Sequence, residues 1–548
     1  MKIVISVCCC MMILPVNVQS QQNIKTDRSF ELSKNLEIFS AVYKTLYNTY
    51  VDDINEGDIV KVAIDAMLNR LDPYTNYYPE NDIEDVKLQL LGEYGGIGAL
   101  IHTKGDSTII SEPYEDMPAY KAGLKAGDII ISINGQNVVG KSNEQVRNLL
   151  RGQSGSEILL QIDRRGKKKE FKFKRESIVL PNVQYSGILT NSIGYIRLTE
   201  FTKNAAKNVL DSFYGLKKQN ITGLILDLRG NGGGLLNEAI DIINIFEDKG
   251  QTVVTTVGKI EAKNQKWVTT NKAVDAKIPI VVLIDQSSAS ASEIVSGALQ
   301  DLDRAVIVGN RSFGKGLVQN VIPLPYNAQM KVTVSKYYIP SGRCIQAIDY
   351  SHRDVNGRAV KIQDSLRTAF KTKGGRTVYD GYGIEPDVFV EQEYTSPIIY
   401  SMVAKFLPFD YATEYAENHP SIPQPKDFEI TDEIYDDFVK FLSDKDYSYT
   451  TLTESGIKSL LNDAEKEKCD SVVLEFLKRA EAEIENDKKN DLYKFKDEIK
   501  ELLLSEIVVR YYNQKGRTEA MLKSDKTIEK AVEILSDKNK YDEILGKK

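Results

Sequence analysis

Apolar residues near the N-terminus recur at the spacing of an amphipathic helix. They are Leu32, Leu36, Phe39, Tyr43 and Leu46, and a second helical stretch runs over residues 58–71. Spacings of three and four place such side chains on one face of a helix. We therefore predict an N-terminal helical domain over residues 21–92, whose role beyond packing against the rest of the chain stays open.

Between residues 93 and 176 the pattern changes to short strands, glycine turns and one helix. The strand-like residues 128–133 lead into Asn134-Gly135, a pair that favours a tight hairpin turn. Ser142 and Gln145 have the spacing of a capping box, which begins a helix that carries Val146, Leu149 and Leu150. This order of elements resembles a PDZ domain.

From residue 177 to residue 390 apolar strands alternate with helices. Residues 221–228 and 279–284 are short apolar runs, and each precedes a stretch with helical spacing, at 235–246 and 289–299. Such alternation predicts an α/β fold. Residues 349–376 are polar and lack either period, so we expect a surface excursion there.

Beyond residue 391 the chain is helical and highly charged, and we assign residues 391–548 to a C-terminal helical domain. One face is marked at spacings of three and four by Leu492, Phe495, Ile499 and Leu502. This stripe is typical of a core or partner seam rather than a coiled coil. The charged residues are expected to form a solvated face.

Ser290 falls where the apolar run at 278–284 gives way to a helix, within Ser287-Ser288-Ala289-Ser290-Ala291-Ser292-Glu293. The N–H groups of a helix's first turn lack intrahelical partners, so the Ala291 amide can face an oxyanion that develops beside Ser290. The pattern indicates a serine nucleophile. The alternative is a serine that only caps the helix.

A serine nucleophile needs a base, and Lys315 is the best candidate in the sequence. The three histidines, at positions 102, 352 and 419, lie outside any segment with the pattern of an active site. Lys315 lies between glycines in Ser312-Phe313-Gly314-Lys315-Gly316, where a closely packed backbone would exclude water from its amine. Burial lowers the pKa of a lysine, and a neutral amine acts as a base. The alternative is a solvated loop cation.

Both segments, together with several others in the same order, resemble the C-terminal processing peptidases, or tail-specific proteases, of the S41 class. The resemblance covers residues 71–390 and rests on Leu71-Asp72-Pro73-Tyr74-Thr75, Gly96-Ile97-Gly98-Ala99, Asp227-Leu228-Arg229-Gly230-Asn231-Gly232-Gly233-Gly234, the serine segment, Gly314-Lys315-Gly316-Leu317-Val318-Gln319, Tyr338-Ile339-Pro340-Ser341-Gly342-Arg343 and Gly383-Ile384-Glu385-Pro386-Asp387. It implies a crotonase-like serine protease core over residues 177–390 with an inserted PDZ domain over residues 93–176. It also implies Ser290 as nucleophile, Lys315 as general base and Gln319 as the side chain that orients the lysine amine.

The glycine-rich segment departs from the family pattern. Members commonly have Asn-Pro-Gly-Gly, whereas this chain has Asn231-Gly232-Gly233-Gly234. The resemblance implies that Gly233 presents its backbone N–H opposite the Ala291 amide, and glycine still permits the close approach that this requires. The alternatives are an ordinary glycine-rich turn and a phosphate cradle. The cradle is disfavoured because the Gly-Lys-Ser/Thr and Gly-x-Gly-x-x-Gly patterns are missing.

The resemblance to a PDZ domain implies a peptide groove. In that fold a peptide adds as a strand between the helix and an edge strand. By resemblance, the N–H groups of Gly96, Ile97, Gly98 and Ala99 receive a terminal carboxylate, while Val146 and Leu149 belong to an apolar pocket. Protein or peptide substrates with free C-termini, ending in small or hydrophobic residues, would fit this groove. The alternative for these glycines is a plain strand bulge.

The composition fits an exported, soluble, multidomain enzyme: 548 residues, 42% hydrophobic and 27% charged. The formal net charge of −7 disfavours nucleic acid as a partner. Lys2 and the apolar residues that follow predict a signal peptide over residues 1–20, hence a periplasmic location, with a membrane anchor as the alternative. Three of the five cysteines, at positions 8, 9 and 10, lie in that leader. Cys344 and Cys469 are not expected to pair, and we predict neither a metal nor a cofactor.

These features predict an exported serine endopeptidase that holds a protein's C-terminal tail in the PDZ groove and cleaves near that end. Ser290 and Lys315 would perform the chemistry, with the amides of Ala291 and Gly233 as the oxyanion hole. The alternatives are a PDZ-containing binding or scaffold protein without activity and a crotonase-type acyl-CoA enzyme. The sequence leaves open whether the chain forms homo-oligomers, whether the C-terminal helices bind an adaptor protein, and whether the PDZ domain activates or inhibits.

Overall fold

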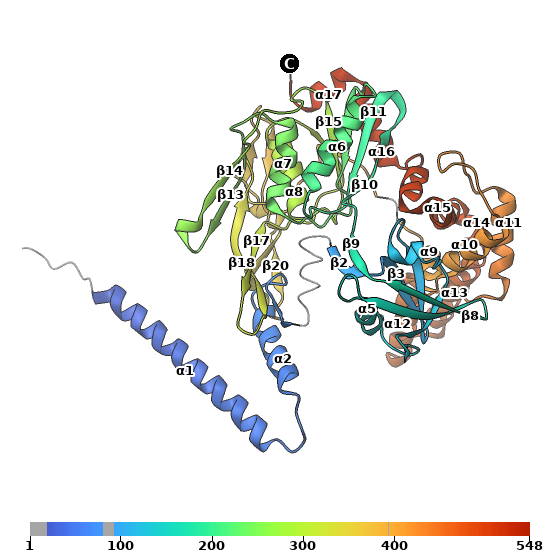
Figure 1. The fold of residues 1–548 in the computed structure, drawn as a ribbon, viewed down its shortest axis with the longest axis horizontal. Coiled ribbons are helices and arrows are strands. Elements are labelled where there is room, and N and C mark those ends of the chain that lie inside the picture. Colours follow the sequence, from blue (N-terminus) through green and yellow to red (C-terminus); the bar gives the residue numbers. More distant parts are fainter. Residues whose placement is uncertain (1–18, 81–92, 393, 548) are drawn as a thin grey trace, which may run out of the picture. The chain divides into compact units, whose positions relative to one another are not determined.

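The computed structural model describes residues 19–80, 93–392 and 394–547 (Figure 1). The chain divides into two compact units, Met1–Tyr77 and Tyr78–Lys548. Within the described ranges, no helix is both long enough and apolar enough to cross a membrane. Residues 1–18 of the predicted signal peptide, with their three cysteines, lie outside the described residues, as do residues 81–92 of the predicted N-terminal domain.

The first unit is helical, as the apolar spacing predicts. It contains α1 (Gln19–Thr49) and α2 (Glu56–Asn69), and β1 (Asn76–Tyr78) spans the division between the units. Helix α2 begins after Asn55, whose side-chain oxygen accepts hydrogen bonds from the N–H groups of Gly57 and Asp58. The turn after α2 is stabilised in the same way by Asp72, because its carboxylate accepts a hydrogen bond from the Tyr74 N–H.

A β-rich module follows, with the elements that the sequence predicts for a PDZ domain. Its main sheet has the strand order β3-β4-β5-β7-β8, with β6 paired to β5, and β2 pairs with β9. Asn134 and Gly135 have φ values of 50° and 80° and form the predicted tight turn between β5 and β6. Ser142 and Gln145 form the predicted capping box of α5. The elements are β2 (Glu93–Gly96), β3 (Ala99–Lys104), β4 (Ser107–Pro113), α4 (Pro118–Lys121), β5 (Ile129–Ile133), β6 (Gln136–Asn137), α5 (Asn143–Leu150), β7 (Glu157–Arg164), β8 (Lys167–Lys174) and β9 (Glu176–Val179).

A six-stranded sheet forms the centre of the second unit, in the order β10-β11-β12-β15-β16-β23. Strand β10 is antiparallel to β11, and the remaining neighbours are parallel. Helices follow the strands, as the alternating pattern predicts. The elements are β10 (Val183–Ile188), β11 (Ile193–Leu198), α6 (Ala205–Lys217), β12 (Gly223–Asp227), α7 (Leu236–Phe246), β15 (Ile280–Ile284), α8 (Ala291–Asp301), β16 (Val306–Gly309) and β23 (Val388–Phe389).

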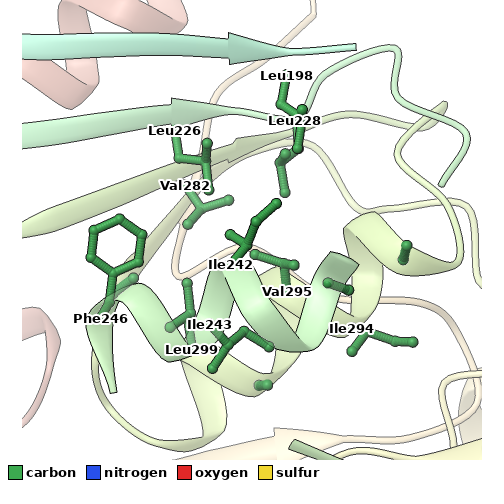
Figure 2. Packing of buried hydrophobic residues seen from close by; sticks show 14 of the residues in the cluster. Leu198, Leu226, Leu228, Ile242, Ile243, Phe246, Val282, Ile294, Val295 and Leu299 are labelled. Carbon is green, nitrogen blue, oxygen red and sulfur yellow. The ribbon is translucent and has the colours of Figure 1, made fainter. Parts of the chain in front are cut away.

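Both faces of this sheet are buried, which explains the apolar runs within β12 and β15. Successive side chains of a strand point to opposite faces. On one face Leu226 and Val282 pack in the same core as Ile242 of α7 (Figure 2). On the other face Ile225 packs in a second core with Ile528, which belongs to a helix near the C-terminus. The C-terminal region therefore completes the α/β body.

A second sheet and two hairpins complete this body. Strands β14, β13, β18 and β17 pair in that order. The predicted surface excursion at residues 349–376 consists largely of two short hairpins whose residues are mostly half-buried or exposed. The strands are β13 (Thr252–Gly258), β14 (Gln265–Val268), β17 (Leu317–Pro323), β18 (Gln329–Tyr338), β19 (Ile348–Arg353), β20 (Ala359–Lys361), β21 (Ala369–Lys371) and β22 (Thr377–Tyr379).

The C-terminal region is helical, as predicted. The sequence marks Leu492, Phe495, Ile499 and Leu502 as one helix face, but the helix is interrupted at Phe495, so Leu492 lies on one helix and Ile499 and Leu502 on the next. All four side chains pack into one hydrophobic core. The stripe is therefore a core seam. The helices are α9 (Pro397–Ala404), α10 (Leu407–Asn418), α11 (Asp432–Phe441), α12 (Leu452–Lys466), α13 (Ser471–Lys488), α14 (Asp491–Lys494), α15 (Lys496–Met521), α16 (Lys526–Ser536) and α17 (Lys538–Ile544).

Candidate active site

Ser290 lies at the corner between β15 and α8, as the sequence predicts. Its backbone has a φ of 56° and a ψ of −110°, outside the regions that L-residues favour. The Asp285 carboxylate stabilises the preceding turn by accepting hydrogen bonds from the N–H groups of Ser287 and Ser288. The half-buried Ser290 is thus held in a strained conformation at the start of the helix.

Glu293 joins the serine segment to the lysine segment. Its fully buried carboxylate accepts hydrogen bonds from the Ser290 N–H at 2.8 Å and the Lys315 N–H at 2.9 Å. It also accepts from the Gly314 N–H at 2.7 Å and the Ser312 hydroxyl at 2.5 Å. Burial raises its pKa to about 7, although these hydrogen bonds favour the ionised form. Sequence reasoning gave Glu293 no role, but its capping-box spacing after Ser290 was a usable signal.

Tyr337 joins the same two segments from another side. The hydroxyl of this buried side chain lies 2.6 Å from the Lys315 carbonyl oxygen and 3.2 Å from the Ser290 carbonyl oxygen. Tyr337 is the second-last residue of β18 and directly precedes the family motif at 338–343. Because β18 belongs to the second sheet, that sheet positions Tyr337. Sequence reasoning missed this residue, since nothing in its neighbourhood along the chain indicates a contact with Ser290.

The glycines beside Lys315 allow the close packing that the sequence predicts. A Cβ atom at Gly314 would lie 2.4 Å from the Cβ of Ala347, and one at Gly316 would lie 2.9 Å from the Gln346 N atom. The Gly316 N–H donates to the Gln346 side chain at 2.7 Å. Lys315 itself is half-buried in this packed segment.

Gln319 lies on β17, four residues after Lys315. Its side-chain amide donates a hydrogen bond of 3.2 Å to the Thr333 hydroxyl on β18. This bond anchors Gln319 across the strand pair. The predicted orientation of the lysine amine by Gln319 stays a prediction.

The glycine loop, which we define as residues 229–234, lies against Ser290. A Cβ atom at Gly233 would lie 2.8 Å from the Ser290 Cβ and 2.9 Å from the Ala291 N atom, so only glycine fits there. The Gly233 N–H, the predicted oxyanion donor, donates to the Asn231 side-chain oxygen at 2.9 Å. In this conformation the donor is therefore engaged by its own loop.

Several bonds fasten the glycine loop to the turn before Ser290. The Ala289 N–H donates to the Asn231 carbonyl oxygen at 3.0 Å. The Ser292 hydroxyl donates to the same oxygen at 2.8 Å. The Gly230 N–H donates to Asp285 at 3.0 Å. The glycine loop and the turn at Ser290 thus form one hydrogen-bonded unit.

The predicted peptide-binding residues lie at two places in the PDZ-like module. Gly96 ends β2, and Ala99 begins β3, which is the edge strand of the main sheet. Gly98 has a φ of 69°, and the buried Ile97 accepts a hydrogen bond from the Ala119 N–H. The Asn143 side chain on α5 donates to the Ile101 carbonyl oxygen at 3.5 Å, so α5 lies beside β3.

The two predicted pocket residues on α5 differ in exposure. Val146 is fully buried in the core of the module, while Leu149 is partly buried and packs against that core. Val146 therefore belongs to the core, and its predicted contact with a peptide stays a prediction. Leu149 retains exposed surface at the module's helix.

Four segments of the chain match models of known families. Residues 192–352 match "Peptidase family S41" and residues 109–164 match "PDZ domain". Residues 398–535 match "Probable PDZ-protease, C-terminal helical domain", and residues 12–82 match "Activating protease CtpB N-terminal domain". The chain is also 35% identical over 333 residues to the carboxy-terminal-processing protease of Bartonella bacilliformis. These aligned residues are 60% of this chain and 76% of that protein. The chain belongs to peptidase family S41.

Two further proteins also match the chain. The probable CtpA-like serine protease of Staphylococcus haemolyticus is 36% identical over 306 residues, which are 55% of this chain and 61% of that protein. The structure of the photosystem II D1 C-terminal processing protease matches with 25% identity and a TM-score of 0.34, over 64% of this chain and 92% of that one. The family matches and the 35% identical relative together make this S41 peptidase a C-terminal processing protease with a PDZ domain and helical domains at both ends.

The three histidines of this S41 peptidase make their contacts outside the Ser290 and Lys315 segments. His102 stacks on Phe406 with ring centroids 3.9 Å apart, and burial lowers its pKa to about 4. His352 is exposed, and His419 stacks on Tyr415. Cys344 and Cys469 are free thiols. Among the described residues, no group of three or more His, Cys, Asp or Glu side chains is arranged to hold a metal ion.

Proposed function

We propose that this S41 peptidase is a serine endopeptidase in which Ser290 is the nucleophile and Lys315 the general base. The observation that carries this proposal is the shared Glu293 carboxylate, which accepts one N–H from each residue at 2.8 Å and 2.9 Å. One buried group thus holds both main chains, so the two side chains start from neighbouring backbone positions. Gln319 is proposed to orient the lysine amine.

The proposed reaction forms and hydrolyses an acyl-enzyme. The Ser290 Oγ attacks the scissile carbonyl carbon while the neutral Lys315 amine takes the hydroxyl proton. Negative charge that develops on the carbonyl oxygen faces the N–H groups of Ala291 and Gly233, after the Gly233 N–H turns from Asn231. The C–N bond breaks as the Lys315 ammonium gives its proton to the leaving amine. Water then attacks the ester as Lys315 takes its proton, and the acyl C–O bond breaks as Lys315 returns that proton to the Ser290 Oγ, which releases the carboxylic acid.

We propose that the PDZ domain selects C-terminal tails. A peptide would add as a strand to the edge of β3, beside α5. Its terminal carboxylate would accept hydrogen bonds from the backbone N–H groups around Gly96, Ile97, Gly98 and Ala99. Leu149 would contact the last apolar side chain, with Val146 packed beneath it.

Export to the periplasm belongs to the same proposal. It is supported by the sequence pattern of a signal peptide over residues 1–20. A retained membrane anchor is the alternative location, in which the leader is not cleaved.

The test compares the wild-type chain with Ser290→Ala in cells and as purified protein. Exported proteins whose C-termini differ between the two strains would be identified by C-terminal peptide mapping. We then expect purified wild type, but not Ser290→Ala, to convert the identified precursors to the shortened forms. Binding of those precursors without cleavage by the wild type would instead support a scaffold function.

A further inference from the structure

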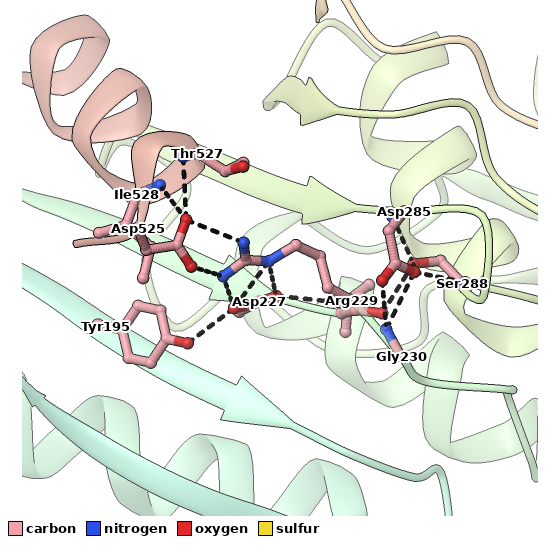
Figure 3. Close-up of polar contacts among 10 residues, drawn as sticks. Tyr195, Asp227, Arg229, Gly230, Asp285, Ser288, Asp525, Thr527 and Ile528 are labelled. Atoms are coloured by element: carbon pink, nitrogen blue, oxygen red, sulfur yellow. Dashed lines mark hydrogen bonds and ion pairs between the residues drawn. The ribbon is translucent and has the colours of Figure 1, made fainter. Parts of the chain in front are cut away.

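Helix α16 of the C-terminal region begins beside the glycine loop. Its cap residue, Asp525, accepts hydrogen bonds from the Thr527 and Ile528 N–H groups at 2.9 Å and 3.1 Å. The same carboxylate pairs with Arg229, whose guanidinium nitrogens lie 3.0 Å from Oδ1 and 2.7 Å from Oδ2 (Figure 3). A neutral cap such as asparagine would satisfy the helix end but not form this ion pair.

Arg229 lies between two carboxylates. Its other partner is Asp227 at the end of β12, which accepts from Arg229 Nε at 3.0 Å and from a terminal nitrogen at 2.6 Å. Burial alone would raise the pKa of Asp227, but the Arg229 guanidinium overcomes this effect and lowers it. The side chain of Arg229 is only 17% exposed. Because its charge is largely removed from water, the position of Arg229 depends strongly on these two partners.

Arg229 is the first residue of the glycine loop, and the residues that follow it contact the turn at Ser290. The next N–H, that of Gly230, donates to Asp285, which holds the turn before Ser290 (Figure 3). Asn231 then accepts from the Ala289 N–H, and Gly233 packs against Ser290. A displacement of Arg229 would therefore move the glycine loop and, through these hydrogen bonds, the turn at Ser290.

We propose that Asp525 is a positioning residue of the protease, which acts through Arg229 to hold the glycine loop against Ser290. The proposal rests on the proposed function of that loop. It gives the C-terminal helices a role in the catalytic step. Arg229 and Asp525 are separated by 296 positions in the sequence.

The test uses three full-length variants that separate charge from capping. Asp525→Asn keeps a capping oxygen and removes the charge, whereas Asp525→Glu keeps the charge on a poorer cap. Asp537→Asn is the matched control, because Asp537 caps α17 through the Asn539 and Lys540 N–H groups, and in the described part of the chain it pairs with no arginine. The substrate is a quenched fluorescent peptide with a free, apolar C-terminus.

We expect Asp525→Asn to lower kcat roughly threefold to thirtyfold while KM stays unchanged. Amide hydrogen exchange across residues 229–234 should become faster in the same variant. Asp537→Asn should match the wild type in both measurements, and Asp525→Glu should retain more activity than Asp525→Asn.

Three results would overturn the proposal. The first is an unchanged kcat and an unchanged rate of hydrogen exchange in Asp525→Asn. The second is an equal loss of kcat in Asp525→Asn and Asp537→Asn. The third is a higher kcat in Asp525→Asn than in Asp525→Glu. If the wild type cleaves no peptide, the proposed function fails, while hydrogen exchange still decides whether Asp525 orders the loop.

Discussion

At the residue scale, the proposed chemistry requires Ser290 and Lys315 to transfer one proton between them. We expect Ser290→Ala and Lys315→Ala each to lower kcat on the order of 10⁴-fold or more. The double variant should be no worse than either single one, because the two groups act as a unit. Steady-state hydrolysis of the fluorescent peptide measures this.

Ser287 supplies a matched control for the serine change. It lies three residues before Ser290 in the same segment and is exposed. Ser287→Ala should therefore retain wild-type turnover. Normal hydrolysis by Lys315→Ala would remove the lysine from the proposed mechanism.

Glu293 is one residue whose burial makes the free energy of unfolding depend on pH. Folding raises its pKa from 4.5 to about 7, so the folded state favours the protonated carboxyl. This stabilisation is fully present below the unfolded pKa and is lost as the pH rises through about 7. By linkage it amounts to about 3 kcal/mol.

The corresponding measurement compares wild type with Glu293→Gln, which does not titrate. The unfolding free energy of the wild type, relative to this variant, should decline between about pH 4.5 and pH 7 and then level off. Denaturant unfolding over this pH range, with other conditions fixed, gives the difference. A difference that does not vary with pH would contradict the raised pKa of Glu293.

At the scale of elements, the glycine loop makes a matched pair of substitutions possible. Gly233 has a φ of 102°, and a Cβ atom there would meet the serine turn, whereas a Cβ atom at Gly232 would meet no atom within 4 Å. We expect Gly233→Ala to lower kcat by about 10²-fold to 10³-fold and to destabilise the fold by about 1–3 kcal/mol. Gly232→Ala should be close to wild type in both respects.

Activity and thermal unfolding of both glycine variants provide the test. Full activity in Gly233→Ala would show that the loop does not approach the nucleophile closely. The strain at Ser290 and the tight loop occur on connections between strands and helices, where local geometry rather than periodicity decides the backbone.

At the scale of the whole molecule, recognition and chemistry are proposed to lie in different domains. Amidating a substrate's C-terminus replaces a charge-assisted contact with a neutral one, a loss of about 1.5–3 kcal/mol. KM should therefore rise roughly tenfold to a hundredfold, while kcat stays unchanged. Paired free-acid and amidated forms of one fluorescent peptide measure the effect.

The inactive Ser290→Ala protein separates binding from turnover in that experiment. It should bind the free-acid peptide more tightly than the amidated one by a similar factor, as measured by fluorescence polarisation. Equal binding of both forms would refute tail recognition by the PDZ domain, even if Ser290 proved to be catalytic.

The sequence by itself determined the features that depend on neighbouring residues. Apolar periodicity predicted the helical regions and the α/β alternation, and Asn134-Gly135 and Ser142 with Gln145 predicted a turn and a helix start that the structure contains. The corner at Ser290 followed from the change between an apolar run and a helical spacing. These signals are local because turns, caps and strand alternation are made by residues close together along the chain.

Only the tertiary structure decided which distant groups meet. Glu293 contacts the lysine segment across 22 residues of sequence, and Arg229 meets Asp525 across 296. It also showed that the Gly233 N–H is engaged by Asn231 and that Val146 is buried. Such contacts form when segments far apart in the sequence pack on the two faces of the central sheet. The sequence offers many possible polar partners, and only this packing brings particular ones within hydrogen-bond distance.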